Sequence, residues 1–156
     1  MILTYGLYWS IEKVHWGWQN NKGSLRGGAS RSANAKPVEF RQQRGIYALY
    51  AEYDLVYLGQ TGAGADRLFK RLKRHRTDHL AERWNRFSWF GTQWVTAANK
   101  LSADVAELGD SLPVVLNILE AISIAISEPR LNLQRGRWGA TKQYYQLDPE
   151  DGSDDE

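Results

Sequence analysis

The sequence has no cysteine among its 156 residues, only three histidines, and no run of about 18 apolar residues. The lack of cysteine excludes a disulfide scaffold, thiolate-bound zinc, iron–sulfur clusters and thiol catalysis. Three histidines are too few for a cage built from several histidine ligands. Because the N-terminus also lacks the basic region and cleavage site of a secretory signal, the sequence predicts a cytoplasmic protein without a membrane span. Its length is that of one domain with a sizeable core.

The formal net charge of +2 conceals an uneven distribution of charge along the chain. The last eleven residues contain six acids and no base, which leaves all 20 bases and 12 acids in the other 145 residues, a net charge of +8. The densest basic stretch, 67–76, has six lysines and arginines. A basic body favours a polyanionic partner such as nucleic acid, although a solvated helix face is the ordinary alternative. Residues 148–156 are predicted to be a disordered acidic tail, since they bury too little surface to offset ordering entropy.

The first 43 residues form a predicted N-terminal extension that is rich in aromatic and basic residues. Residues 4–9, TYGLYW, favour a strand, and a second short strand is predicted near 14–18. Residues 20–37 contain glycine, serine, asparagine and bases with almost no apolar side chain, which is typical of a flexible loop. Its bases, which include Lys22 and Arg26, suit a phosphate backbone, so we expect this loop to become ordered only against a partner.

Two β-rich runs, GIYALYA (45–51) and DLVYLGQ (54–60), predict an antiparallel hairpin. A three-residue loop between them would place Tyr47 opposite Tyr57 on one face of the sheet, whereas a two-residue loop would break that pairing. Residues 86–95 are the next predicted strand. A short final strand is predicted in KQYYQL, residues 142–147.

A helix is predicted from residue 67 into the low 80s, after a glycine-rich turn in which Asp66 is the expected N-cap. Leu68, Phe69 and Leu72 would face the core. The opposite positions follow helical spacing and share one basic face: Arg67, Lys70, Arg71, Arg74 and His75. Residues 111–129 predict a second, mostly buried helix whose narrow polar stripe contains Glu120. An acid in so apolar a helix needs water, a partner or a metal ion.

An ordered set of short motifs carries the functional signal of the chain. The set consists of Gly45-Ile46-Tyr47, Tyr57-Leu58-Gly59, Arg71 with His75 four residues later, Glu120, and Leu131-Asn132. Through these residues, the stretch 44–135 resembles the GIY-YIG nucleases, which include homing endonucleases, some restriction enzymes and a repair incision domain. Leu58 stands in place of the motif's isoleucine. The resemblance implies a nuclease domain over 44–147 with a small α/β fold, a three-stranded and mostly antiparallel sheet flanked by helices, with the N-terminal strand and loop as an extension.

The same resemblance implies a metal-dependent endonuclease that hydrolyses DNA phosphodiester bonds. It assigns the activation of water to Tyr47 or Tyr57, and we favour Tyr47, with Tyr57 orienting the phosphate or the water. Arg71 would stabilise the phosphate charge, and His75 would accept a proton from Tyr47 or contact phosphate. The remaining implied roles are support of the site by Asn132 and binding of one Mg²⁺ or Mn²⁺ ion by Glu120.

These residue types suit the chemistry on physical grounds. One carboxylate can hold a hard cation whose shell is completed by water and phosphate oxygens, and a guanidinium can donate two bonds to a phosphate. A tyrosine is a poor base at its ordinary pKa of about 10, but we expect Arg71 and a metal ion to favour the Tyr47 phenolate. Contacts to DNA are expected from six cations: Arg67, Lys70, Arg74, Arg76, Lys22 and Arg26.

Each of these residues also has a structural alternative. Tyr47 and Tyr57 could be packing aromatics, Glu120 could point to solvent, and Arg67 competes with Arg71 for the catalytic position, although the helical spacing to the histidine favours Arg71. The competing functions are a nucleic-acid-binding module without catalysis and a partner-docking protein. The choice among DNA, RNA and single strands is open, because phosphate contacts carry no base information. Specificity would come from the extension, a homo-oligomer or a partner protein, and only analogy connects such nucleases with restriction or phage defence.

Overall fold

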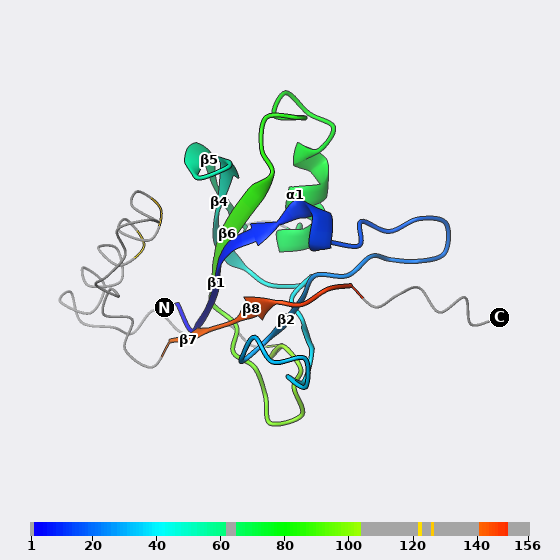
Figure 1. Cartoon of the computed structure of the whole chain (residues 1–156), viewed down its shortest axis with the longest axis vertical. Helices are drawn as coiled ribbons and strands as arrows, with labels where there is room; N and C mark the ends of the chain where they lie inside the picture. Colours follow the sequence, from blue (N-terminus) through cyan, green and yellow to red (C-terminus); the bar gives the residue numbers. More distant parts are fainter. Residues whose placement is uncertain (1, 62–64, 104–121, 123–125, 127–140, 150–156) are drawn as a thin grey trace.

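The computed structural model describes residues 2–61, 65–103, 122, 126 and 141–149 of the chain. They form a five-stranded mixed sheet with the strand order β5-β4-β6-β1-β7 and a three-stranded sheet with the order β3-β2-β8 (Figure 1). The strands are β1 (Thr4–Ser10), β2 (Arg26–Gly28), β3 (Val38–Glu39), β4 (Gly45–Ala51), β5 (Asp54–Thr61), β6 (Arg86–Gly91), β7 (Lys142–Gln143) and β8 (Tyr145–Gln146). The named helices in the described ranges are η1 (Ile11–Lys13), a 3₁₀-helix, and α1 (Leu68–His75).

The predicted fold class, a three-stranded sheet flanked by helices, is wrong, because the described chain is mostly sheet. The N-terminal strand β1 extends the antiparallel unit β5-β4-β6 by pairing with β6, and β7 continues the sheet on the other side of β1, so the sheet has five strands and not three. The physical reason is that β1 carries large apolar side chains on both faces. Tyr5 and Trp9 are 6% and 2% exposed and belong to clusters on opposite faces. Pairing β1 with the equally aromatic β6 buries both sets of rings.

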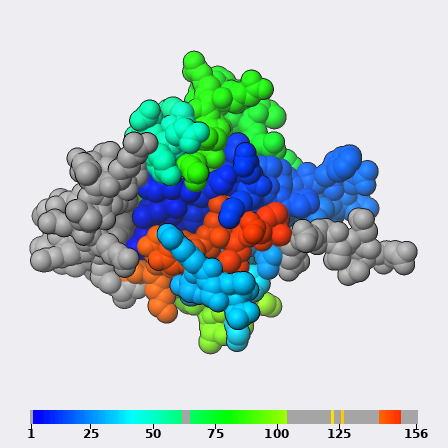
Figure 2. Space-filling view, viewed as in Figure 1, coloured from blue at the N-terminus to red at the C-terminus, as the bar shows by residue number. Residues whose placement is uncertain are grey.

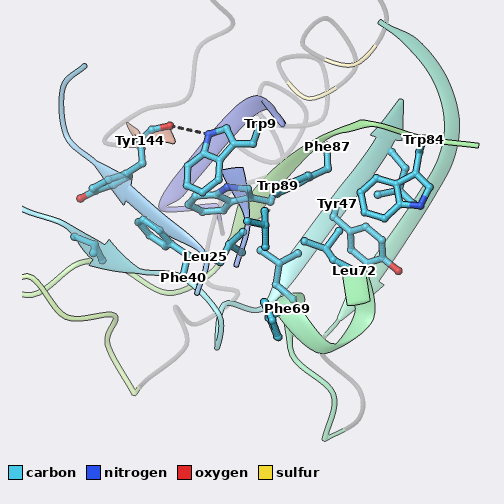
Figure 3. Close-up of a cluster of buried hydrophobic side chains, with 14 of the residues drawn as sticks. Trp9, Leu25, Phe40, Tyr47, Phe69, Leu72, Trp84, Phe87, Trp89 and Tyr144 are labelled. Carbon is cyan, nitrogen blue, oxygen red and sulfur yellow. Dashed lines mark hydrogen bonds between the residues drawn. The ribbon is translucent and has the colours of Figure 1, made fainter. Parts of the chain in front are cut away.

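The two faces of the large sheet hold separate hydrophobic clusters. The larger cluster, the main core, is centred on four aromatic side chains, Trp9, Phe40, Phe87 and Trp89 (Figure 3). The ring centroid of Trp89 lies 5.4 Å from that of Trp9 and 4.6 Å from that of Phe40. The helix α1 covers this face through its buried side chains Leu68, Phe69 and Leu72, as predicted.

The second cluster lies on the other face and includes Tyr5, Tyr50 and Phe90. Of the helix predicted over 111–129, the structure describes Ile122 and Ile126, which are helical and buried in this cluster. The rest of that prediction lies outside the described residues. No helix in the described part of the chain is long and apolar enough to cross a bilayer.

Part of the segment 20–37 is ordered within the chain itself, although the sequence predicts order only against a partner. Leu25 is fully buried in the main core, and β2 pairs with both β3 and β8. Glu39 fixes the start of β2, because its carboxylate accepts the Leu25 N–H at 2.7 Å and the Ser24 hydroxyl at 2.8 Å. The second strand predicted near 14–18 is limited to one bridge between His15 and Ser24.

The predicted hairpin is confirmed by β4 and β5, which pair antiparallel from Gly45 opposite Thr61 to Ala51 opposite Asp54. The connecting turn therefore has two residues, and not the three that would pair Tyr47 with Tyr57. The strand predicted over 86–95 is confirmed in its first part as β6, and the strand predicted in 142–147 is divided between β7 and β8.

The helix α1 is shorter than predicted and is capped differently. It ends at His75, because Asp78 accepts the backbone N–H of Leu80 at 2.8 Å and so starts a turn that competes with the helix. At the other end the N-cap is Arg67, without a side-chain capping bond. Asp66, the predicted N-cap, instead pairs with basic side chains one and two turns further along α1.

Candidate active site

Tyr47 lies at the centre of a polar cluster on the face of the large sheet that α1 covers. Its side chain is fully buried, and its hydroxyl points away from the aromatic centre of the main core (Figure 3). That hydroxyl lies 2.8 Å from Nε2 of His75 and accepts a hydrogen bond from Nε of Arg71 at 3.4 Å. Side chains from β4 and from two successive turns of α1 therefore meet at one phenolic oxygen.

A bulge in the hairpin brings Tyr57 to the same face as Tyr47. The predicted pairing of the two tyrosines is wrong, since Tyr47 lies opposite Gly59 and Tyr57 lies opposite Leu49. A two-residue turn alone would send Tyr57 to the other face, but an extra β5 residue at the register shift after Leu49 restores its orientation. The Tyr57 ring centroid is 6.1 Å from that of Tyr47 and 4.8 Å from that of His75. Tyr57 is partly exposed and forms the solvent side of the cluster.

His75 is held by hydrogen-bond partners at both nitrogens of its buried ring. Asp78 Oδ2 lies 2.7 Å from Nδ1, while Nε2 faces the Tyr47 hydroxyl. An ionised carboxylate can only accept, so Nδ1 carries a proton, and in the neutral tautomer of the ring Nε2 is then the acceptor for the Tyr47 hydroxyl. Asp78, His75 and Tyr47 thus form a chain of hydrogen bonds that runs from the end of α1 to the sheet.

Asp78 is the residue of this cluster that sequence reasoning missed. The available signal is an acid three residues after His75, a spacing that lets a carboxylate reach the ring at a helix end. The predicted helix continues into the low 80s, and within such a helix an acid at position 78 is indistinguishable from the other charged surface residues. The indole of Trp84 donates to the His75 carbonyl at 3.1 Å and helps to fix this helix end.

Burial raises the pKa of the Tyr47 phenol above its ordinary value, and the neighbouring Arg71 offsets only part of that rise. Arg71 alone therefore does not lower the Tyr47 pKa below its ordinary value, and the expected joint effect of Arg71 and a metal ion stays a prediction. The hydrogen bond to Tyr47 raises the pKa of Arg71, which stays charged. Burial also acts to raise the pKa of Asp78, but the Leu80 N–H and His75 outweigh it and hold that pKa below its usual value. At neutral pH the cluster therefore contains a neutral phenol, a guanidinium and a carboxylate.

The two motif glycines stand at positions where a Cβ atom would not fit. Gly45 has φ +148°, and a Cβ there would collide with the carbonyl oxygen of Phe90 on β6. A Cβ on Gly59 would lie 2.5 Å from both Cζ and the hydroxyl oxygen of Tyr47. Because Gly59 has no side chain, the ring of Tyr47 can occupy the space beside it.

The variant Gly59→Ala is expected to lose about 1–3 kcal/mol of unfolding free energy, because the added methyl group overpacks a buried ring. Denaturant titration of wild type and variant measures the loss. Leu58→Ala is the control: its side chain is 54% exposed on the same strand, and its change should stay within about 0.5 kcal/mol. An unchanged midpoint for Gly59→Ala would contradict the tight packing.

Four of the cations predicted to contact DNA lie at or on α1. Lys70 and Arg74 are exposed and both pair with Asp66, at 2.8 and 2.5 Å. Arg67 donates to a neighbouring backbone carbonyl at 3.2 Å, whereas Arg71 donates to Tyr47. The fourth, Arg76, places its guanidinium 4.5 Å from the ring centroid of Trp16.

The other predicted site residues lie away from this cluster or outside the described residues. Lys22 is exposed in the loop before β2, and Arg26 donates to the backbone carbonyl of Asp148 at 3.4 Å. Glu120 and Asn132 lie outside the described residues. Within the described part of the chain, no three histidine, aspartate or glutamate side chains gather as a metal site.

Comparison of the chain with protein-family models, with curated proteins and with solved structures found no match.

Proposed function

We propose that the chain hydrolyses phosphodiester bonds in nucleic acid, with the chemistry of the GIY-YIG nucleases that its motifs resemble. The observation that carries the proposal is the Tyr47 hydroxyl, held between the acceptor nitrogen of His75 at 2.8 Å and the guanidinium of Arg71 at 3.4 Å. A proton acceptor and a phosphate-binding cation within reach of one hydroxyl are the groups that the attack of water on a phosphodiester needs.

The proton of the attacking water passes through Tyr47 to His75. Burial disfavours a free Tyr47 phenolate, so the phenol must lose its own proton while it gains one from water. The Tyr47 proton goes to Nε2 of His75, and the imidazolium that forms is stabilised by the carboxylate of Asp78 at 2.7 Å. Hydroxide forms the new bond to phosphorus, the bond to the leaving oxygen breaks, and the leaving oxyanion takes a proton from solvent water.

Arg71 binds the phosphate in the same step. Its Nε–H bond to Tyr47 is long at 3.4 Å, so a phosphate oxygen can replace that acceptor at little cost. The guanidinium then forks onto the non-bridging oxygens, where negative charge increases in the transition state. Its movement also opens the buried Tyr47 hydroxyl to water on the side where Tyr57 is partly exposed.

The basic face of α1 supplies the contact with the nucleic-acid backbone. Lys70 and Arg74 are exposed next to Arg71, and Asp66 holds them in place by ion pairs. DNA is the proposed substrate. A Mg²⁺ or Mn²⁺ ion on Glu120 is part of the proposal, and it would supply a positive charge to the phosphate and the leaving oxygen.

The proposal is tested by nucleic-acid cleavage with Mg²⁺ or Mn²⁺, comparing the wild-type chain with Arg71→Ala. Supercoiled plasmid, single-stranded DNA and RNA are the substrates. We expect cleavage of at least one of them by wild type and a loss of about 10²-fold or more in the variant, because a transition-state cation is removed. Lys100→Ala, which removes an exposed cation remote from Tyr47 in the sequence, should cleave like wild type.

Two outcomes would overturn the proposal. If Arg71→Ala cleaves as fast as wild type, the cleavage does not arise at the Tyr47 cluster. If wild type cleaves none of the three substrates with either ion, the chain is no nuclease by itself, and the cluster is structural.

A further inference from the structure

A pocket of about 560 Å³ opens between the large sheet and the small sheet. Its walls come from β1, η1, the β4–β5 turn, the start of β6, and the strands β7 and β8. Figure 2 shows β1, the C-terminal strands and the segment after β2 side by side on this face. The volume is that of a small-molecule site. Its lining includes no residue of the Tyr47 cluster, so it is a second candidate site.

The pocket is positively charged. Lys13, Arg31 and Arg86 line it, and no aspartate or glutamate is among its described lining residues. Arg86 is fixed in place, because its Nη1 donates to the Tyr8 carbonyl at 3.2 Å. Lys13 and Arg31 are exposed, and Lys13 lies 3.4 Å from Asp148, also exposed. A phosphate can displace such an exposed ion pair at little cost, so the pocket favours an anion.

Two stacks of arginine on tyrosine also line the pocket. The Arg31 guanidinium lies 4.9 Å from the ring centroid of Tyr145, and the Arg86 guanidinium lies 5.4 Å from that of Tyr53. Guanidinium planes and tyrosine rings are the surfaces on which proteins stack nucleobases. A planar, anionic ligand can both stack on the arginine–tyrosine pairs and pair with the positive charges of the pocket, whereas an acidic peptide can only pair with the charges.

The pocket is held in shape by contacts between its walls. The side-chain amide of Gln146 on β8 donates to the Ser10 carbonyl at 2.8 Å and accepts the Ser10 N–H at 2.6 Å. On β1, Tyr8 has φ +53° at an irregularity in the register, and its N–H is bound by Ser88 Oγ at 3.0 Å. Bulges of this kind re-aim side chains beside binding sites.

We propose that this pocket binds a nucleotide, with Lys13 and Arg31 on the phosphate and the base stacked against the arginine–tyrosine pairs. The nucleotide can be free or can be one unit of a nucleic-acid strand. The site goes beyond the proposed hydrolysis and does not depend on it, because its lining includes neither Tyr47 nor its polar partners Arg71 and His75.

Binding is measured by calorimetry on the full chain in EDTA, so that cleavage plays no part in the result. The probes are deoxyadenosine monophosphate, inorganic phosphate, a hexaglutamate peptide and a 5′-phosphorylated single-stranded oligonucleotide. We expect the nucleotide to bind more tightly than inorganic phosphate, and the double variant Lys13→Ala/Arg31→Ala to weaken it at least about tenfold. The control Arg83→Ala/Lys100→Ala removes the same charge from exposed positions outside the pocket and should bind like wild type.

If the oligonucleotide binds more tightly than the mononucleotide, the ligand is one unit of a nucleic-acid strand. If the two bind equally, the ligand is a free nucleotide. Both results support a nucleotide site in this pocket. Three results would overturn the proposal: no nucleotide binding by wild type, equal weakening by the two double variants, or equal affinity for inorganic phosphate or a hexaglutamate peptide. Because Lys13 and Arg31 are exposed, both double variants are expected to fold, and thermal unfolding checks this.

Discussion

Replacing Tyr47 with phenylalanine is expected to lower the rate of nucleic-acid cleavage by about 10²- to 10⁴-fold, because it removes the hydroxyl that passes the proton from water to His75. The hydroxyl does not bind the phosphate in this mechanism, so substrate binding should change little and the loss should appear in kcat. The variant also leaves the buried acceptor nitrogen of His75 without its partner, which costs about 1–3 kcal/mol of unfolding free energy. Single-turnover cleavage and denaturant titration measure the two effects.

Tyr50→Phe is the matched control for this experiment. Tyr50 is a fully buried tyrosine on the same strand, but it belongs to the cluster on the other face of the sheet. Its replacement should leave the cleavage rate within about twofold of wild type, since it has no contact with the proposed relay. If Tyr47→Phe keeps full activity while Tyr57→Phe loses it, the water is activated by Tyr57 and the relay through His75 is wrong.

More of the candidate site than of the fold could be predicted from the sequence. Each short motif lies within one strand or one helix. The spacing of its residues along the chain therefore fixes which of them share a face. Arg71 and His75 are four residues apart, so they share a helix face whatever the rest of the chain does. The same argument placed Leu68 and Leu72 against the core, where the structure has them.

The fold depends on pairings between distant segments, which spacing does not reveal. Trp9 packs against Trp89, eighty residues further along, and this contact places β1 inside the sheet. The local hydrophobic pattern of a strand cannot show which distant strand has a matching face. The sequence therefore predicts the N-terminal strand only as an extension. Leu25 illustrates the same limit: one buried apolar residue in a polar segment orders β2 against two other strands.

Tyr47 and Tyr57 share a face of the sheet for a different reason from the one that the sequence predicts. The sequence predicts that a three-residue turn places both tyrosines on one face, but the turn has two residues. They share a face because an irregularity after Leu49 shifts the register. Bulges arise where side-chain packing outweighs the loss of a ladder bond, so they depend on neighbours that a sequence reading does not have. In this hairpin the shifted register brings the Tyr57 ring centroid to 4.8 Å from that of His75.

Asp78→Asn is expected to lower kcat between about tenfold and 10³-fold without changing KM, because Asp78 orients His75 and does not touch the phosphate. An asparagine can still accept the Leu80 N–H, so the turn after α1 should form. The substitution removes the negative charge of Asp78, which fixes the ring proton of His75 on Nδ1 and stabilises the His75 imidazolium. Asp54→Asn, an exposed acid on β5, is the control and should cleave like wild type.

The pH dependence of stability provides a second readout of Asp78. Its pKa is held below the ordinary value in the folded chain, so its contribution to stability is complete above the ordinary aspartate pKa of about 3.9 and is lost as the pH falls through the lowered folded value. The difference in unfolding free energy between wild type and Asp78→Asn should therefore be constant at neutral pH and shrink below about pH 4. A merely structural aspartate would show the same acid limb, but it would leave kcat unchanged. If Asp78→Asn keeps wild-type kcat at neutral pH while the acid limb is lost, Asp78 supports the fold and has no part in positioning His75 for proton transfer.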